Sequence, residues 1–443
     1  MSEAPAGRTS RVFIDGFNLA LSQGTGVATY ARNLSYALHG MGHRVGVLYG
    51  NRSGPAKDPL AREVGFFDPP VSLMPQWLAD IFRGIKLSQR PFGLKAWSVP
   101  VTGAVIAHGM PYYDEIWNAS DMFGLAAVYN EMVGGMLKVR IPGGPPDIMH
   151  WTYPFPVEVA GARNIYTLHD LVPMRLPATT LDNKRRYLRM ARAIAKRAEH
   201  IVTVSEHSRR DIIDLLQVPP ERVTNTYQAV DIPAGLRNKP QNLIRDEIQG
   251  SFGLISGEYF LFFGAIEPKK NIGRMIEAYL ASGVKGPLVI VGKKAWHSEN
   301  ELRLLFNDHI EFLQTDGPFT YTRHRIMHLE YAPFPLLVSL IRGARAVLFP
   351  SLYEGFGLPV LEAMLLGAAV MTSNTSSLPE VVGDAALTVD PYDVAGMAQA
   401  IRALDSDAGL RARLSAAAPA QADLFSPARY QERLRALYAR IGA

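Results

Sequence analysis

Short apolar runs alternate with amphipathic stretches in both halves of the chain. Helical spacing of apolar residues lies between most of these runs. In the first half, the runs predict strands at residues 11–15, 44–50, 147–151, 164–170 and 200–205. In the second half, they predict strands at residues 259–264, 287–292, 346–351, 369–373 and 386–390. Strands that alternate with helices indicate parallel sheets with helices on both faces.

Two such series predict an α/β chain with two Rossmann-like, doubly wound parallel-sheet domains that face a central cleft. A less patterned stretch at 231–249 carries Pro and Gly residues and is interpreted as the linker. The predicted domains are therefore residues 1–235 and 236–426. The last segment, 427–443, is expected to be a helix with Tyr430, Leu434 and Leu437 on one face.

Residues 51–145 show no clean period and are interpreted as an irregular insert in the first domain. One part of this insert mixes aromatic and basic side chains. Such a mixture is typical of an amphipathic segment on a membrane surface, but also of an ordinary helix that packs its aromatic residues inward. The packed helix is the preferred interpretation. The aromatic residues are Trp77, Phe82, Phe92 and Trp97, and the basic ones are Arg83, Lys86, Arg90 and Lys95.

Composition adds few constraints. The 443 residues are 48% hydrophobic and 20% charged, which indicates a globular protein. The chain has no cysteine, which fits a reducing compartment. It has no apolar run of the ~18 residues that span a bilayer and no hydrophobic signal region at its start. We therefore expect a cytoplasmic protein, with a place at the inner face of the membrane as the alternative. The net charge of +5 is most simply a solvated basic surface.

The segment from Ser351 to Gly367, SLYEGFGLPVLEAMLLG, is the most informative one for chemistry. It predicts a strand, a glycine-containing loop and a helix whose first turn holds Pro359. Free amides at a helix start favour an anion such as phosphate, and glycines let the backbone approach a ligand. The candidate residues on the loop are Glu354, Gly355, Phe356, Gly357 and Leu358.

Two carboxylates mark this segment. Glu354 could hold sugar hydroxyls, and Glu362, one turn into the helix, could accept hydrogen bonds from both hydroxyls of a ribose. Alternatively, Glu362 only complements the helix dipole and Glu354 only caps the helix. For either glutamate considered alone, the structural role is preferred. For the whole segment from Ser351 to Gly367, which follows a buried strand, the functional role is preferred.

Residues 263–278, FGAIEPKKNIGRMIEA, form a second candidate segment. The strand ends at Gly264, and Lys269 and Lys270 stand before the next helix. A lysine close to a diphosphate stabilises the charge that develops on a leaving nucleoside diphosphate. A solvated helix start is the weaker alternative, because cations are disfavoured at helix N-termini.

These motifs resemble retaining glycosyltransferase family 4, and most closely the mannosyltransferase-B-type enzymes of bacterial polysaccharide synthesis. EGFGLPVLEAM and the later TSNTSSLPEVVGDAALTVDP carry the likeness, which covers most of the second half. It implies the GT-B fold, with the final helix crossing back to the first domain. It also implies that Lys270 binds phosphate. Many relatives have an arginine where this chain has Ala265, and Lys269 is expected to substitute.

The resemblance also supports a functional role for two sites in the first domain. Gly24 and Gly26, in the loop after the first strand, are expected near the donor phosphates or the acceptor. His169 stands at a strand end, where open α/β sheets bind ligands, and in the family this position lies by the transferred sugar. The alternative for His169 is a structural histidine bonded by Asp170. His150 is a weaker candidate by the same strand-end rule.

The resemblance implies transfer of a hexose, with mannose from GDP-mannose preferred, to a glycan or lipid-linked glycan hydroxyl. The expected partners are the nucleotide-sugar donor, this acceptor and an anionic membrane, with no nucleic acid. No cofactor and no metal are expected, since the lysines can fill a cation's role. The alternatives are a rhamnosyl- or other deoxyhexosyltransferase, a GT-B phosphorylase or epimerase, and a non-catalytic membrane-associated scaffold.

Overall fold

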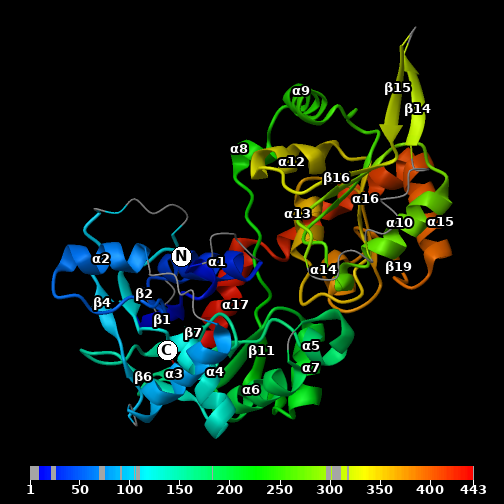
Figure 1. Cartoon of the computed structure of the whole chain (residues 1–443). Helices are drawn as coiled ribbons and strands as arrows, with labels where there is room; N and C mark the ends of the chain where they lie inside the picture. Colours follow the sequence, from blue (N-terminus) through cyan, green and yellow to red (C-terminus); the bar gives the residue numbers. More distant parts are fainter. Residues whose placement is uncertain are drawn as a thin grey trace, which may run out of the picture. The chain divides into compact units, whose positions relative to one another are not determined.

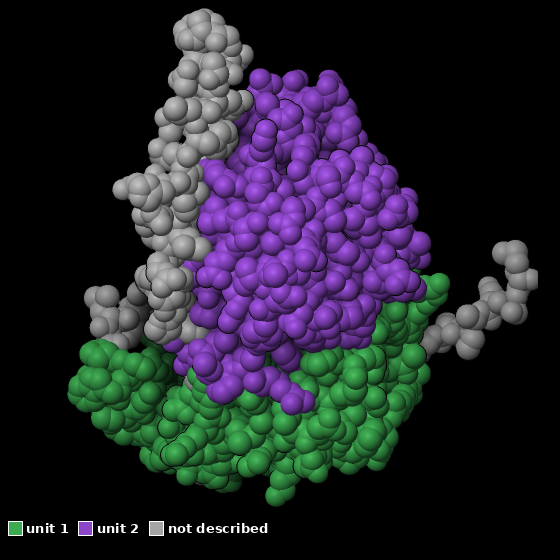
Figure 2. Space-filling view, turned by 90° about the vertical axis from the view of Figure 1, so that its right-hand side faces the viewer, with its two compact units in different colours: residues 1–174, 182–229, 427–443 green, residues 175–181, 230–426 purple. Residues whose placement is uncertain are grey.

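A computed structural model describes residues 9–20, 26–68, 75–89, 92–103, 105, 110–181, 183–295, 301, 311–316 and 319–442. The chain divides into two compact units (Figure 2). Unit 1 comprises residues 1–174, 182–229 and 427–443, and unit 2 comprises residues 175–181 and 230–426. The main boundary thus falls at 229/230, where the sequence analysis placed it at 235/236. No helix among the described residues is long and apolar enough to cross a bilayer.

Unit 1 is built on an eight-stranded sheet with the order β11-β10-β9-β7-β1-β2-β5-β4 (Figure 1). All neighbours pair in parallel except β4 and β5, which are antiparallel. In chain order the strands are β1 (Arg11–Asp15), β2 (Arg44–Tyr49), β4 (Trp97–Val99), β5 (Glu115–Asn118), β7 (Ile148–Trp151), β9 (Arg163–Thr167), β10 (His200–Thr203) and β11 (Val223–Asn225).

The prediction that residues 51–145 are irregular is wrong. This region supplies two strands of the main sheet, β4 and β5. It also supplies three helices, α2 (Pro59–Phe67), α3 (Gln76–Ser88) and α4 (Met122–Val133). Its strands β3 (Leu94–Lys95) and β6 (Leu137–Arg140) form a small parallel sheet with β8 (Val157–Val159). The strands are only two to four residues long, too short to show a period-2 pattern in the sequence.

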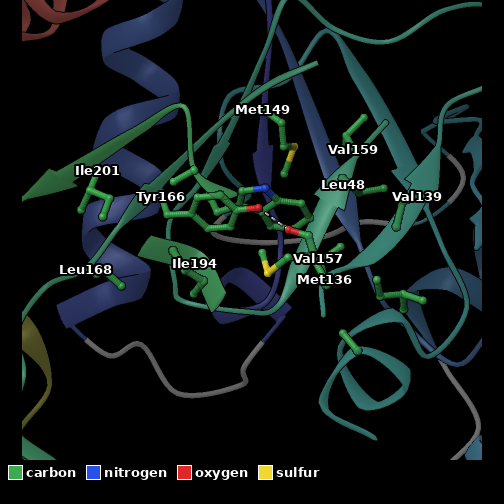
Figure 3. Close-up of a cluster of buried hydrophobic side chains, with 14 of the residues drawn as sticks. Leu48, Met136, Val139, Met149, Val157, Val159, Tyr166, Leu168, Ile194 and Ile201 are labelled. Carbon is green, nitrogen blue, oxygen red and sulfur yellow. Dashed lines mark hydrogen bonds between the residues drawn. The ribbon is translucent and has the colours of Figure 1, made fainter. Parts of the chain in front are cut away.

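The remaining helices of unit 1 cover the sheet and leave a core of apolar side chains between the layers (Figure 3). Trp151 and Tyr166 stack in this core with ring centroids 6.0 Å apart, and the Tyr166 hydroxyl donates to the carbonyl of Val157 at 2.5 Å. A buried tyrosine hydroxyl needs such a partner. The helices are α1 (Gly26–Gly40), α5 (Val172–Arg175, shared with unit 2), α6 (Lys184–Arg197), α7 (Glu206–Leu216) and α17 (Pro427–Arg440).

The C-terminal helix α17 belongs to unit 1, and a buried histidine anchors it there. His150 Nδ1 lies 2.9 Å from the Tyr438 hydroxyl, and its Nε2 lies 2.9 Å from Thr167 Oγ1. Burial lowers the pKa of His150 to about 3, so the ring is neutral. Both ring nitrogens are occupied inside the protein, so the arrangement favours a structural role over the ligand-binding role considered for His150.

Unit 2 contains a six-stranded, fully parallel sheet with the order β16-β13-β12-β17-β18-β19. Four of its strands are entirely buried, which explains their continuous apolar runs. The strands are β12 (Phe260–Phe263), β13 (Leu288–Val291), β16 (Ile326–Leu329), β17 (Ala346–Phe349), β18 (Val370–Ser373) and β19 (Leu387–Val389). A separate antiparallel hairpin joins β14 (Glu311–Asp316) and β15 (Phe319–His324).

The stretch interpreted as a linker is partly helical, which corrects that prediction. It contains α8 (Ala234–Arg237) and α9 (Gln241–Phe252). Lys239 Nζ, almost buried, donates to Glu247 at 2.8 Å and to Ser339 at 3.0 Å, and so ties the segment into unit 2. The other helices of unit 2 are α10 (Ile272–Ser282), α12 (Phe334–Gly343), α13 (Leu358–Leu365), α14 (Leu378–Val382), α15 (Val394–Ser406) and α16 (Ala408–Asp423).

Candidate active site

The loop between β17 and α13 has a fixed shape. Gly357, directly before the helix, has a φ of 108°, which side chains other than glycine rarely tolerate. A Cβ at this position would also lie 2.8 Å from Leu378 Cδ2. The buried Ser377 hydroxyl lies 2.9 Å from the carbonyl oxygen of Glu354 and 2.8 Å from that of Phe356. The loop predicted to hold the donor is therefore held in one conformation by unit 2 itself.

Lys270 and Glu354 form the central contact of the site. Their side chains meet at 2.6 Å between Nζ and Oε1, although 84 residues separate them in the sequence. Both side chains are about nine-tenths buried. The Lys270 ammonium also lies 4.8 Å from the ring centroid of Phe349, at the end of β17. Glu354 is not the N-cap of α13, because that position is Gly357, which makes no side-chain capping hydrogen bond.

The charge of Glu354 is set by burial and by the lysines. Burial alone would raise the pKa of this carboxyl group. The positive charges of Lys270 and Lys269, with the hydrogen bond from Lys270, more than offset that effect and leave the pKa below its usual value. Glu354 is therefore ionised at neutral pH. Lys269 Nζ itself lies 3.5 Å from Glu267.

Asn271 joins the lysine segment to the loop, and the sequence analysis missed it. Its backbone is left-handed, with a φ of 61°, and its Nδ2 donates to the carbonyls of Pro350 at 3.0 Å and Pro391 at 2.7 Å. The amide of Leu352 also donates to the carbonyl of Lys269 at 2.8 Å. An asparagine directly before a helix is a recognisable signal for such a turn.

The start of α13 offers backbone donors. The amide of Val360 donates to the carbonyl of Gly357, and Pro359 has no amide N–H. Among the described residues, the amides of Gly357 and Leu358 have no acceptor. Two free N–H groups at a helix N-terminus, on the same loop as Glu354, suit an anionic ligand.

Glu362 lies on α13, one turn into the helix. It is half-buried, and burial raises its pKa to about 7. No described residue donates a hydrogen bond to its carboxylate. A carboxylate that is desolvated without a partner is costly, and such groups are concentrated at ligand sites.

The strand-end glycine of β12 allows close packing. Gly264 has a φ of 136°, and a Cβ on Gly292, at the end of β13, would lie 1.8 Å from the Gly264 carbonyl oxygen. The two strand ends can therefore approach this closely only because both positions are glycine. Ala265 is exposed directly after Gly264 and brings no charge to this edge.

Unit 1 has its own group of polar residues at strand ends. Asp15, at the end of β1, accepts hydrogen bonds from the backbone amide of Thr152 and, at 2.8 Å, from its hydroxyl. The Thr152 carbonyl accepts a hydrogen bond from His169 Nε2 at 2.9 Å. His169 therefore takes its partner from Thr152 and not from Asp170, whose carboxylate accepts the amide of Val172.

This arrangement fixes the protonation of His169. Burial lowers the pKa of the ring, which is neutral at pH 7. Because Nε2 donates to a carbonyl, Nδ1 is the acceptor nitrogen. The ring also packs edge-on against Tyr30, at 4.8 Å between centroids. Sequence analysis missed Asp15 and Thr152, although a carboxylate that ends an apolar strand is a usable signal.

The predicted site residues thus form two groups. Lys270 is bonded to Glu354, and Lys269 contributes to the same electrostatic environment, in unit 2. His169 and Gly26, the first residue of α1, belong to unit 1. Gly24 lies outside the described residues. Among the described residues, no hydrogen bond or ion pair joins Glu362 to the Lys270–Glu354 pair.

Two doubly wound, mainly parallel sheets in two units, with a glycine-containing loop and a buried lysine at strand ends of unit 2, are the architecture of the GT-B class. Residues 25–226 match the model of the glycosyl transferase 4-like domain, and residues 245–421 match that of glycosyl transferases group 1. The crystal structure of HepE from Anabaena in complex with UDP and glucose has a similar fold, with a TM-score of 0.63 at 15% identity over 97% of this chain and 100% of that one.

Curated sequences support the same class. The chain is 33% identical to the O-antigen chain mannosyltransferase B of Escherichia coli over 269 residues, which are 60% of this chain and 67% of that protein. It is 28% identical to the serotype-specific mannosyltransferase WbdA of the same species, over 62% of this chain but only 33% of WbdA. The chain belongs to the family 4, group 1 glycosyltransferases with the GT-B fold.

Proposed function

We propose that this glycosyltransferase moves mannose from GDP-mannose, with retention of configuration, to a hydroxyl of a glycan or lipid-linked glycan in polysaccharide synthesis. The names of the two curated relatives support the sugar and the process. The observation that carries the proposal is the buried ion pair between Lys270 and Glu354, beside the free amides at the start of α13.

The diphosphate of the donor is assigned to Lys270, Lys269 and the amides of Gly357 and Leu358. Glu354 holds the Lys270 ammonium in place through the contact between Nζ and Oε1 at 2.6 Å. A diphosphate can share this ammonium group, because an ammonium has three donors. The ribose hydroxyls are assigned to Glu362, whose carboxylate has no described partner.

The assigned reaction is a substitution on one face of the sugar. The acceptor oxygen forms a bond to the anomeric carbon as the bond from that carbon to the phosphate oxygen breaks. The acceptor's proton passes to the departing phosphate oxygen, so GDP leaves with the electron pair. The lysine charges stabilise this leaving group in the role that a metal ion fills elsewhere. No protein base is assigned.

The acceptor groups are assigned to unit 1. His169 presents Nδ1 as an acceptor, because Nε2 is held by Thr152. A sugar hydroxyl can donate to this nitrogen. Gly26 is the first residue of α1 and is assigned to the acceptor side with His169.

The donor is tested with radiolabelled nucleotide sugars: GDP-mannose, dTDP-rhamnose and UDP-glucose. We expect release of GDP from GDP-mannose above the rates for the others, and faster release with a mannan acceptor. A preference for dTDP-rhamnose would overturn the sugar assignment. Release of sugar 1-phosphate only when inorganic phosphate is added would indicate a phosphorylase. The Glu354→Gln variant is the control, because it should lose turnover with every donor.

A further inference from the structure

Helix α3 exposes apolar side chains and buries a charge. Trp77, Ile81 and Ile85 recur at intervals of four residues and are 66%, 52% and 50% exposed, with Phe82 beside them at 47%. Arg83 is only 7% exposed. A helix that merely packs on a protein shows the opposite distribution. This also corrects the preferred interpretation of the segment, in which its aromatic residues packed inward.

The inverted orientation is held by specific contacts. The Arg83 guanidinium donates to Asp121 at 2.8 and 3.0 Å and to Asp80 at 2.8 Å. It lies against Gly124 of α4, where a Cβ would approach the guanidinium to 2.4 Å. A paired and buried arginine of this kind fixes the rotation of α3 about its axis. The apolar side is therefore a stable feature of unit 1.

The exposed surface continues onto the end of α4. Met132 and Val133 are 66% and 64% exposed. A Cβ added at Gly84 would lie 3.9 Å from the Met132 sulfur, so Met132 adjoins α3. Helices α3 and α4 lie next to each other in Figure 1. We call this surface the apolar face, defined as Trp77, Ile81, Phe82, Ile85, Met132 and Val133. Contiguous exposed apolar surfaces of this kind mark interaction sites.

Basic side chains border the apolar face. Lys86 is exposed on α3 itself. Arg186 lies 3.7 Å from the Glu131 carboxylate, and Arg189 donates to the Glu131 carbonyl, so the basic side of α6 meets the end of α4. Arg185 and Arg192 are exposed on the same helix.

We propose that the apolar face and its basic border dock this enzyme on an anionic lipid bilayer, with α3 lying in the interface. Tryptophan and aliphatic side chains enter the headgroup region, while arginine and lysine contact lipid phosphates. A second copy of the chain fits less well, because a two-fold interface would bring two basic borders together. The inference goes beyond sugar transfer and does not depend on the identity of the donor.

The test is cosedimentation of the full chain with phosphatidylcholine vesicles, with and without phosphatidylglycerol. We expect binding that requires phosphatidylglycerol and weakens at high salt. Ile81→Ser should weaken it at least about tenfold, because full burial of one such side chain corresponds to roughly a ten- to hundredfold change in partition. The matched control is Ile255→Ser in unit 2, since Ile255 is equally exposed, at 54%. Arg185→Gln should weaken binding several-fold.

Three results would overturn the proposal. The first is absence of wild-type binding to phosphatidylglycerol vesicles. The second is equal binding by Ile81→Ser and Ile255→Ser. The third is a dimer, detected by sedimentation velocity, that Ile81→Ser dissolves, since this would assign the face to a second copy. Hydrolysis of the nucleotide sugar, measured without vesicles, should be the same in both isoleucine variants. Failure of the docking proposal is thereby separated from failure of the proposed function.

Discussion

The strand ends of the two units carry polar groups of different electrostatic character. In unit 2, Lys270 and Glu354 form a buried ion pair at 2.6 Å between Nζ and Oε1. In unit 1, the Thr152 peptide is held between Asp15 and a neutral His169. The first arrangement suits a substrate whose charge changes during the reaction. The second suits a neutral hydroxyl. The same kind of sheet thus carries different strand-end residues in the two units, and this difference is the basis of the proposed division between leaving group and acceptor.

The largest effect is expected from Lys270→Ala, which removes the positive charge from unit 2. Turnover should fall by about 10²-fold or more, as when one preorganised electrostatic donor is lost. Steady-state kinetics at saturating donor would measure this, with the exposed Lys285→Ala as the matched control. Turnover near that of the wild type would refute the assignment of Lys270 to the leaving diphosphate.

Loss of stability must be separated from loss of chemistry in this variant. Lys270→Ala leaves the Glu354 carboxylate buried without its partner, which is strongly destabilising. The double variant Lys270→Ala/Glu354→Gln removes both charges. Its melting temperature should lie above that of Lys270→Ala, while its turnover should stay low. Recovery of turnover together with stability would mean that the pair is only structural.

The sequence predicted these two regions unequally. The strands of unit 2 are continuous apolar runs, and the loop with Glu354 is a continuous motif. Both could therefore be predicted directly from the sequence. The contact of Lys270 with Glu354 could not, because it spans 84 residues. In unit 1, the short strands β4 and β5 lacked a readable pattern. Asp15 and Thr152 were missed because a hydrogen bond through a backbone peptide leaves no motif.

The orientation of α3 could not be predicted from the sequence for a different reason. Its sequence has helical spacing, but spacing does not determine which side faces the protein. That choice depends on Asp121, 38 residues from its partner Arg83. The same holds for Lys239 and Ser339, which fix the stretch that was interpreted as a linker.

An intermediate effect is expected from Glu362→Gln. If the carboxylate binds the ribose hydroxyls, donor affinity measured by calorimetry should fall roughly tenfold, since hydrogen bonds to a charged group are worth about 1.5–3 kcal/mol each. Unchanged affinity would count against the role. Glu380→Gln, on α14 of the same unit, is the control.

The same variant should show a pH-dependent gain in stability. Burial raises the folded pKa of Glu362 from 4.5 to about 7. Its contribution to stability is therefore present below pH 4.5 and lost as the pH rises to about 7, because the folded state holds the proton more tightly. Relative to the wild type, Glu362→Gln should melt higher at pH 8 and about equally below pH 4.5, where the carboxyl is protonated in both states. A difference that does not grow with pH would show that the carboxylate is well solvated.

The smallest effect, and the sharpest test of the contrast between the units, is expected from Asp15→Asn. Burial raises the pKa of Asp15 to about 6, partly opposed by its hydrogen bonds from Thr152. As the pH falls through this value, the carboxylate loses acceptor capacity, and the Thr152 peptide holds His169 less firmly. Turnover at saturating donor should then fall by a few-fold along an acid limb near pH 6.

In Asp15→Asn this acid limb should disappear, because the amide does not titrate. The acid limb is expected in the pH profile of kcat, because kcat reports the enzyme with donor bound. Titration of Glu362 is expected instead in the pH profile of kcat/KM for the donor. Asp170→Asn is the matched control, because Asp170 adjoins His169 in the chain but does not hold Thr152. Persistence of the limb in Asp15→Asn, or its loss in Asp170→Asn, would refute positioning of His169 through Asp15. The hydrogen-bond network of Asp15, Thr152 and His169 would then have no demonstrated part in acceptor chemistry.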